Sequence, residues 1–494
     1  MPLLTLSIAI PLAGALLAAL LPARLTRAPR AVALGAALLS AAAIAATWIR
    51  FDAGRGMQLV EQASWIPSID VAWRLGVDGL SLSLAALTVV LFLPAVAYGV
   101  GPRPLTRAAA ALLLLLEAAT LAFFLAQDFV VFYVAFDVTL VAMYFLIALW
   151  GEANRRYAAL KFFLYTLLGS LPVLLGIIAL FLVSDPGTFD MTALAREPAY
   201  RDAGTGATLV FLAFFVGFAI KTPIVPFHTW LPAAHVEAPT AGSVLLAGVL
   251  LKMGGYGLIR VNLQMLPAAF ARYALPIALL GLVSALYGAF VALAQRDLKR
   301  LVAYTSVNHM GYVVIGVAAA AASGASARAR ELALDGAVLQ MVAHGIVTAG
   351  LFLVAGIVLE RAGTRDLDRL GGLLAPMPVY GSLTAVLFFA SLGLPGLAQF
   401  PAELQVFLGT FDVFPAIAAV ALLGLLVSAA LFLRALQRAF LGEPPARWRR
   451  LPDLGRRELV ALLPLVALTV ALGLWPRLAL DLIDSGAWLL GAVR

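Results

Sequence analysis

The sequence predicts an all-α polytopic membrane protein of about fourteen transmembrane helices, with two inverted five-helix repeats and broken helices 7 and 12. Three observations predict this class: the composition, a series of long apolar runs, and the distribution of basic residues. Of the 494 residues, 63% are hydrophobic and 12% are charged, and the mean hydropathy is +1.00. Soluble domains contain about 25% charged residues, so this chain has too little polar surface for a soluble fold of its length.

The composition also excludes several kinds of chemistry. The chain has no cysteine, which excludes disulfides, thiolate metal sites, iron–sulfur clusters and cysteine nucleophiles. Its four histidines are few for a metal site, so we expect this chain to bind no metal and no cofactor. The net charge is +8, which in a membrane protein records loop topology, and no basic patch with interleaved aromatic residues indicates nucleic-acid binding.

Fourteen apolar runs are each long enough to cross a bilayer, which requires about 20 residues in a helix. They cover residues 2–22, 31–49, 79–100, 108–126, 129–150, 158–184, 208–230, 241–262, 273–295, 300–322, 336–360, 376–411, 413–440 and 457–476. The first run lacks a basic leader region and is followed by three arginines. We therefore expect it to be retained as a helix and not cleaved as a signal peptide.

Basic residues are unevenly divided between the two sets of loops. The loops after runs 1, 3, 5, 9, 11 and 13 contain 21 of them, and the loops after runs 2, 6, 8, 10 and 14 contain 11. The two that remain, Lys221 and Lys252, lie inside apolar runs. Because short cytoplasmic loops carry an excess of Lys and Arg, both termini are predicted to lie on the outer, periplasmic side.

Two of the runs are interrupted by proline. Residues 220–240 contain four prolines, and residues 391–403 contain two. Proline removes a helical hydrogen bond, and backbone groups freed at membrane depth need protein or a water-filled cavity around them. Paired breaks, one in each half of the chain, indicate a transporter built on inverted repeats. We therefore predict N-terminal helices at 1–107, a first repeat at 108–262, a second repeat at 263–440, and a C-terminal loop and helix at 441–494.

Eight ionisable side chains lie within these runs or at their ends, where a charge costs about 2.5–3.5 kcal/mol at the helix centre. They are Glu117, Asp128, Asp137, Lys221, Lys252, His309, His344 and Glu403. Their spread over consecutive helices suits a lateral proton relay better than a compact catalytic site. A carboxylate near a buried lysine stabilises its charged form, so small changes in the distance between Asp137 and Lys221 are expected to move a proton.

Structural roles stay open for some of these residues taken singly. One satisfying neighbour would explain Glu117 or Lys252, and a core position would explain His344. A place near a helix end favours a structural role for Asp128. His228 and His235 suit an interfacial polar role as well as a proton path. The whole set is harder to explain in this way than any one member.

Several long strings of this sequence resemble the antiporter-like membrane subunits of respiratory complex I. They are FYVAFDVTLVAMYFLIALWG, KFFLYTLLGS, IKTPIVPFHTWLPAAHVEAPTAGSVLLAGVLLK, DLKRLVAYTSVNHMGYVVIG, QMVAHGIVTAGLFLVAG and ASLGLPG, within residues 70–440. In that family a helix-5 acid, a helix-7 lysine, a helix-8 lysine or histidine and a helix-12 lysine or glutamate form the proton channel. The resemblance implies that these roles fall on Asp137, Lys221, Lys252 and Glu403. His309 and His344 are implied as further relay or water-binding positions.

The helix-12 position separates the paralogues of this family. The L-type and N-type subunits and the Mrp antiporters usually carry lysine there and the M-type carries glutamate, so Glu403 favours the M-type (NuoM-like). The short stretch after the last run, with no room for the lateral helix of the L-type, favours the same choice. Two departures stand out: Asp137 replaces the usual glutamate with a side chain one methylene shorter, and Pro401 is expected to shift the second break.

The resemblance implies a proton-translocating membrane subunit of a bacterial NADH:quinone oxidoreductase in the inner membrane. Such a subunit belongs to a translocase enzyme but has no redox centre of its own. NADH, flavin and iron–sulfur centres would be held by partner subunits, and L-type and N-type subunits would be its neighbours in the bilayer. An Mrp-type cation/proton antiporter subunit is the main alternative. A membrane subunit of a hydrogenase-type or formate-linked complex also stays open, whereas a purely structural spacer does not explain eight buried ionisable groups.

Overall fold

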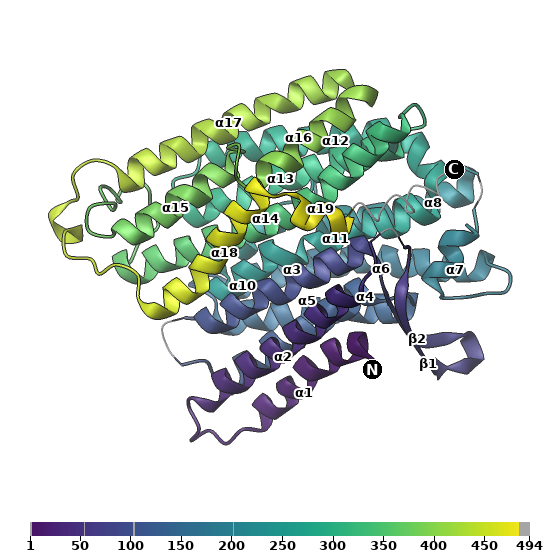
Figure 1. Ribbon diagram of the computed structural model, residues 1–494, viewed down its shortest axis with the longest axis horizontal. Helices are drawn as coiled ribbons and strands as arrows, with labels where there is room; N and C mark the ends of the chain where they lie inside the picture. The colour runs from purple at the N-terminus through teal and green to yellow at the C-terminus, as the bar shows by residue number, and fades with distance from the viewer. Residues whose placement is uncertain (1, 54, 102–103, 201, 484–494) are drawn as a thin grey trace.

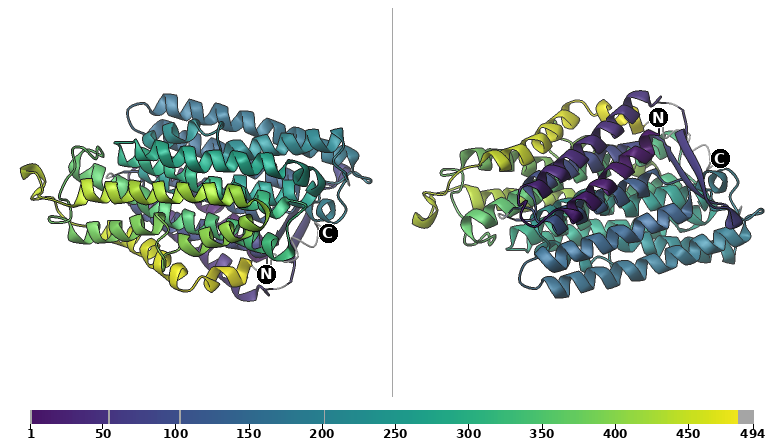
Figure 2. Two further views of the ribbon diagram at one scale, coloured as in Figure 1. Left: turned by 90° about the horizontal axis from the view of Figure 1, so that it is seen from above. Right: turned by 90° about the horizontal axis from the view of Figure 1, so that it is seen from below.

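The computed structural model describes residues 2–53, 55–101, 104–200 and 202–483. Helices run side by side along the long axis of the molecule, and the loops gather at its two ends (Figure 1). The same alignment is visible from above and from below (Figure 2). The structure is therefore the helical bundle that the composition predicts.

Twelve continuous helices within the described residues are long and apolar enough to cross a membrane. They are α1 (Leu3–Leu20), α2 (Ala28–Arg50), α3 (Gly79–Tyr98), α4 (Arg107–Leu125), α5 (Phe129–Trp150), α6 (Arg155–Val183), the composite helix Thr240–Leu263, α12 (Pro267–Leu293), α13 (Leu298–Ala321), α14 (Ala327–Ala362), α17 (Pro415–Phe440) and α18 (Arg456–Leu474). Each coincides with a predicted apolar run, so the all-α polytopic class is confirmed.

The two interrupted runs are broken in the structure as predicted. The first gives α8 (Thr205–Lys221) and α9 (Trp230–Glu237), and the second gives α15 (Pro378–Ser391) and α16 (Gln399–Val413). Pro401 lies in the first turn of α16, where a missing N–H costs no helical hydrogen bond, so the break precedes it. The total of fourteen spans and the division into two inverted repeats stay predictions.

The composite helix Thr240–Leu263 alternates between α and π geometry, which the sequence analysis did not predict. Its segments are α10 (Thr240–Leu245), η2 (Leu246–Leu250), α11 (Lys252–Gly257) and η3 (Leu258–Leu263), of which η2 and η3 are π-helical. This helix is surrounded by protein along its whole apolar stretch. Short π segments inside α-helices frequently occur at functional sites.

One end of the bundle carries a β-hairpin for which the sequence analysis made no prediction. Strands β1 (Gln58–Ile66) and β2 (Val71–Val77) pair antiparallel around the turn η1 (Pro67–Ile69), close to the short helix α7 (Met191–Arg196) (Figure 1). Arg74 of β2 lies 3.7 Å from Asp128 and 3.5 Å from Asp190. Asp128 also caps α5 by accepting from the Val130 N–H. Burial raises the pKa of Asp128, whereas backbone hydrogen bonds and Arg74 act in the opposite direction.

The other end of the bundle is tied together by a second ion-pair network. Arg365 contacts Glu152 at 2.6 Å and Asp297 at 3.1 Å, and Lys299 contacts Glu152 at 3.3 Å. This network joins loops that follow predicted runs 5, 9 and 11, whereas the network around the hairpin joins loops that follow runs 2, 4 and 6. Alternate loops therefore lie at opposite ends of the bundle, as the charge bias predicts.

The C-terminal part of the described chain contains two short elements besides α18. They are the turn η4 (Ala446–Trp448) and helix α19 (Arg477–Ile483). Residues 484–494 of the predicted C-terminal segment lie outside the described residues.

Candidate functional site

The first part of the site lies where α8 breaks. Lys221 is the last residue of α8, it is 1% exposed, and its Nζ has no hydrogen-bond partner among the described residues. The ammonium group lies 4.8 Å from the centroid of the Phe136 ring on α5. Asp137, which follows Phe136 on α5, is half-buried and interacts electrostatically with Lys221. The structure thus places the two members of the predicted pair near each other, without a direct hydrogen bond.

The second part of the site is centred on Lys252. Its Nζ lies 2.7 Å from Nδ1 of His344 on α14 and also donates to the Ala247 carbonyl. Lys252 and His344 are both fully buried. Because η2 ends just before Lys252, the carbonyl five residues earlier in the chain is within reach of its ammonium group.

Two further side chains extend this contact toward the second broken helix. The His309 ring on α13 lies edge-on to the His344 ring, with 5.4 Å between the centroids. Nδ1 of His309 is 3.2 Å from Nε2 of Gln399, the first residue of α16. A file of buried polar groups therefore runs from α11 through α14 and α13 to α16.

Glu403 lies one turn further along α16 and is 2% exposed. Gln340 of α14 is a polar neighbour of its carboxylate, and Tyr312 of α13 lies near enough to interact electrostatically. Gly393, in the break between α15 and α16, has a φ of +80°, and a Cβ built there would lie 2.5 Å from Oε2 of Glu403. The break therefore needs glycine both for its backbone conformation and for the room it gives the carboxylate.

The two parts of the site meet through neighbouring residues. A Cβ built on Gly254 of α11 would lie 2.2 Å from Oγ1 of Thr222, the residue after Lys221. No hydrogen bond joins Lys221 to Lys252 within the described part of the chain. The close packing brings the two lysine-bearing segments together, and a proton passing between the lysines needs water or a movement of the side chains.

His235 belongs with these residues, although the sequence analysis left its role open and did not include it in the relay. It is fully buried on α9, stacks on Phe352 with 4.4 Å between the centroids, and has no partner for either ring nitrogen within the described residues. It interacts electrostatically with Lys252 and Lys299. The only signal in the sequence was its place inside the first interrupted run.

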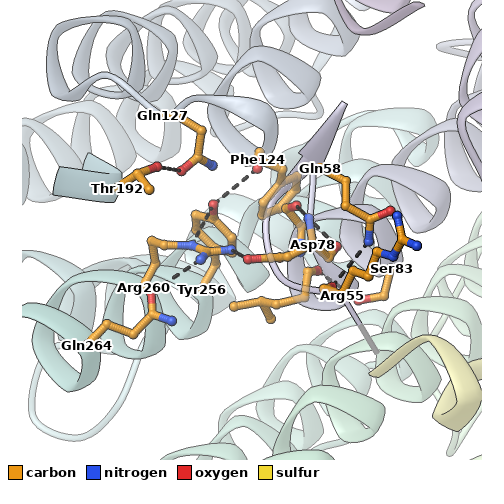
Figure 3. Close-up of polar contacts among 12 residues, drawn as sticks. Arg55, Gln58, Asp78, Ser83, Phe124, Gln127, Thr192, Tyr256, Arg260 and Gln264 are labelled. Atoms are coloured by element: carbon orange, nitrogen blue, oxygen red, sulfur yellow. Dashed lines mark hydrogen bonds and ion pairs between the residues drawn. The ribbon is translucent and has the colours of Figure 1, made fainter. Parts of the chain in front are cut away.

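Arg260 corrects one inference from the loop charges. It was counted with the loop after run 8, but it is a 3%-exposed residue inside the composite helix. One guanidinium nitrogen lies 2.5 Å from Oδ2 of Asp78, the N-cap of α3, and Nε donates to the Tyr256 hydroxyl at 3.1 Å. Figure 3 shows this cluster, including Gln264 one turn further along. The loop count assigned Arg260 to a loop because it stands near the end of a run. Its partner Asp78 is 182 positions away in the sequence, so the ion pair could not be seen there.

The remaining predicted residues lie apart from the file. Glu117 is fully buried on α4, where Ser40 of α2 is its polar neighbour. Asp128 caps α5 at the hairpin end, in agreement with the structural interpretation. His228 packs edge-on against Tyr287, with 5.0 Å between the centroids. The described residues contain no cluster of three or more histidine or acidic side chains that could hold a metal ion.

Two broken helices, with a buried file of ionisable side chains that runs from beside the first of them to the second, define a polytopic, ion-translocating membrane protein. Residues 126–428 match the family model described as NADH:quinone oxidoreductase/Mrp antiporter, TM. The chain therefore belongs to this family.

Individual relatives cover nearly the whole chain. It is 40% identical to NADH-quinone oxidoreductase subunit M of Rhodobacter capsulatus over 88% of this chain and 84% of that protein. It is also 40% identical to an NAD(P)H-quinone oxidoreductase chain 4 of Synechococcus elongatus over 98% of this chain and 90% of that protein. A chain of respiratory complex I from Thermus thermophilus superposes with a TM-score of 0.87 and 32% identity, covering 99% of this chain and 100% of that chain.

Proposed function

We propose that this chain is the M-type proton-translocating membrane subunit of an NADH:quinone oxidoreductase. Its part in that enzyme is to move protons across the membrane while partner subunits transfer electrons from NADH to quinone. The similarity to subunit M and to a chain of complex I supports this assignment. The relay residues proposed are Asp137, Lys221, Lys252, His344, His309 and Glu403.

One observation carries the proposal: the buried file that starts at Lys252 and ends at the second broken helix. The contact of 2.7 Å between Lys252 and His344 is short enough for direct proton transfer. His309 and Gln399 extend it, and Glu403 follows on the same helix as Gln399. A lysine with a purely structural role needs one hydrogen-bond partner, and such a role does not explain why His344 and His309 follow Lys252 in one continuous series of contacts.

The chemistry of the relay follows from the pairing of charges. When Asp137 moves toward Lys221, it stabilises the protonated lysine, and when it moves away, that lysine releases its proton more readily. Water held at the break by hydrogen bonds to the freed backbone carbonyls can carry the released proton to the next basic group. Histidine accepts and donates through two different nitrogens, so His344 and His309 can pass a proton along without a net change of charge.

Electron transfer in partner subunits drives this cycle if it changes the pairing at one end of the file. Such coupling between distant sites is an allosteric free energy, typically 1–3 kcal/mol for one conformational step. We propose L-type and N-type subunits as the neighbours in the bilayer and a bacterial inner membrane as the location, with both termini on the periplasmic side. NADH, flavin and iron–sulfur centres are assigned to partner subunits, and none to this chain.

An Mrp-type cation/proton antiporter subunit is the alternative within the same family. Glu403 argues against the Mrp assignment, because the resemblance places lysine at this position in Mrp subunits. Co-purification of the chain with NADH dehydrogenase activity separates the two proposals directly. Recovery of the chain in a complex that exchanges cations for protons but oxidises no NADH would favour the Mrp assignment.

The test is proton pumping by the intact complex in vesicles. We expect Lys252→Ala to reduce NADH-driven pumping about tenfold or more, because proton transfer by a positioned group contributes at least a hundredfold to such steps. Glu403→Gln, which keeps the shape but cannot ionise, is expected to reduce pumping similarly. The vesicles are normalised to the amount of assembled complex.

Matched controls are available in the same chain. Lys161→Ala removes a lysine that is partly exposed on α6, and Glu443→Gln neutralises an exposed loop glutamate. Both controls are expected to pump like the unmodified complex. Unchanged pumping in Lys252→Ala and Glu403→Gln, with the complex fully assembled, would show that these residues do not carry protons.

A further inference from the structure

Two arginines at one end of the bundle lack acidic partners. Arg30 lies in the first turn of α2 and Arg457 in the first turn of α18, and neither forms a salt bridge with any described residue. Nε and one terminal nitrogen of Arg30, and Nε of Arg457, are inaccessible to solvent and have no hydrogen-bond partner within the described chain. Buried N–H groups are normally paired, so these donors need an explanation.

The two guanidinium groups converge on Gly99, which follows α3. A Cβ built on Gly99 would lie 3.1 Å from a terminal nitrogen of Arg30 and 3.6 Å from a terminal nitrogen of Arg457. The two nitrogens are therefore no farther apart than these distances added together. Gly99 has a φ of +80° and no side chain, which lets both guanidinium groups approach its backbone closely.

The carboxylates nearby already have other partners. Glu360 accepts a hydrogen bond of 2.8 Å from the Tyr98 hydroxyl. Glu458 pairs with Arg361 and also accepts from the Gly455 N–H at the start of α18. They lower the positive charge of the region, but no salt bridge joins them to Arg30 or Arg457.

Arg457 is held in position by other contacts. Its Cζ lies 5.0 Å from the centroid of the Tyr98 ring, and one terminal nitrogen donates to the Gly101 carbonyl at 2.9 Å. Arg30 has no such contact with any residue that the structure describes, and it repels Arg457 electrostatically. Both arginines are partly exposed as whole side chains, so an anion can approach them from outside and offset the repulsion between the two charges, which water would leave in place.

The position of the pair indicates which anion is available. The start of α2, the end of α3 and the start of α18 lie at the end of the bundle that the charge bias assigns to the cytoplasm. Arginines at the ends of spanning helices lie at the depth of the lipid headgroups. Guanidinium groups bind phosphate with paired, charge-assisted hydrogen bonds.

We propose that Arg30 and Arg457, on either side of Gly99, form a binding site for a phosphate group, as carried by the headgroup of an anionic phospholipid. The bound phosphate bridges α2 and α18 over the end of α3. It joins the N-terminal helices to the C-terminal helix, which are far apart in sequence. This site is separate from the proton relay and does not depend on it.

The test uses the purified complex that contains this chain and a photoactivatable phosphatidylglycerol, with cross-links mapped by mass spectrometry. We expect labelling at the start of α2 and the start of α18, and about tenfold less of it in the double variant Arg30→Gln/Arg457→Gln. The matched control is Arg27→Gln/Arg456→Gln, which removes the same charge from exposed neighbours in the same loops. This control is expected to keep the labelling.

Competitors distinguish the source of the phosphate. Displacement by unlabelled phosphatidylglycerol but not by phosphatidylcholine supports a lipid headgroup, whereas equal displacement by inorganic phosphate supports the site with a free anion as its ligand. Arg30→Gln alone serves if the double variant does not assemble, because Arg30 has no partner in the described chain to lose. Full labelling of the variants, or equal loss in the control, overturns the proposal. Loss of a partner subunit with unchanged lipid labelling also overturns it and assigns the arginines to a protein contact.

Discussion

Replacing Gly393 by alanine tests whether the position of Glu403 governs proton transfer. The new Cβ would lie 2.5 Å from Oε2 of Glu403, and Cβ atoms essentially never approach other atoms within 3.0 Å. The carboxylate, which is the mobile end of a flexible side chain, must therefore move by at least half an ångström. The substitution leaves its charge and its burial in place.

The backbone cost of this substitution can be separated from its effect on Glu403. Gly393 has a φ of +80°, and a non-glycine residue in the left-handed region costs about 1–2 kcal/mol. Gly363, which ends α14, has a φ of +67° and no atom within 4 Å of a built Cβ. Gly363→Ala therefore carries the same backbone cost without a new contact, and it is the matched control.

We expect both variants to lose similar thermal stability but only Gly393→Ala to lose proton pumping. A misplacement of about 1 Å can slow a positioned step about a hundredfold, so roughly a tenfold loss is expected for half that shift. The assay is NADH-driven quenching of a pH-sensitive dye in inverted vesicles, normalised to assembled complex. If Gly393→Ala pumps as well as Gly363→Ala, the reasoning about Glu403 is wrong.

Three further predictions follow from contacts in the site. Asp78→Ala is expected to lower the free energy of unfolding by about 3–5 kcal/mol because it leaves Arg260 buried without its carboxylate, and adding Arg260→Leu should recover part of the loss in thermal unfolding of the complex. Lys252→Ala and His344→Ala share one contact, so their double variant is expected to pump no worse than the more impaired single variant in the vesicle assay. Gly254→Ala places a Cβ against the backbone of the first break, and immunoblotting is expected to show little assembled complex.

Two of these three predictions have a matched control in the chain. Gly35→Ala, where a built Cβ meets no atom within 4 Å, should leave the amount of complex unchanged. Lys161→Ala should leave pumping unchanged in the same vesicles. A double variant of the Lys252 contact that pumps far less than either single variant would show that the two residues act independently. Equal stability of Asp78→Ala and the unmodified complex would contradict the buried ion pair.

The membrane class, the spans and both breaks were predictable because the bilayer restricts the possible structures so strongly. Every backbone group must be satisfied within the chain, so a long apolar run has little choice except a helix. Pro223 and Pro395 mark the breaks because proline cannot donate to the helical ladder. The ionisable residues of the file were predictable for a related reason, since a charge inside an apolar run is costly and has to be accounted for.

The residues missed by the sequence analysis were missed for physical reasons as well. Arg260 stands near the end of a run, where a loop cation and a buried ion-pair member look the same until Asp78 is known. His235 is surrounded by prolines, and whether it faces a loop or the core depends on how α9 folds back. In the hairpin, β1 is largely exposed and β2 is largely buried, so neither strand shows the alternation of buried and exposed residues that would predict it.

By itself, the sequence determined that the chain lies in a membrane, that its loops alternate between the two ends, where the helices break, and most of the residues of the buried file. Tertiary structure decided which of those residues touch. Lys252 meets His344 across 92 positions, and His309 meets Gln399 across 90. Composition and periodicity act over a few turns of one helix, whereas these contacts depend on how separate helices pack, and only the assembled bundle determines that.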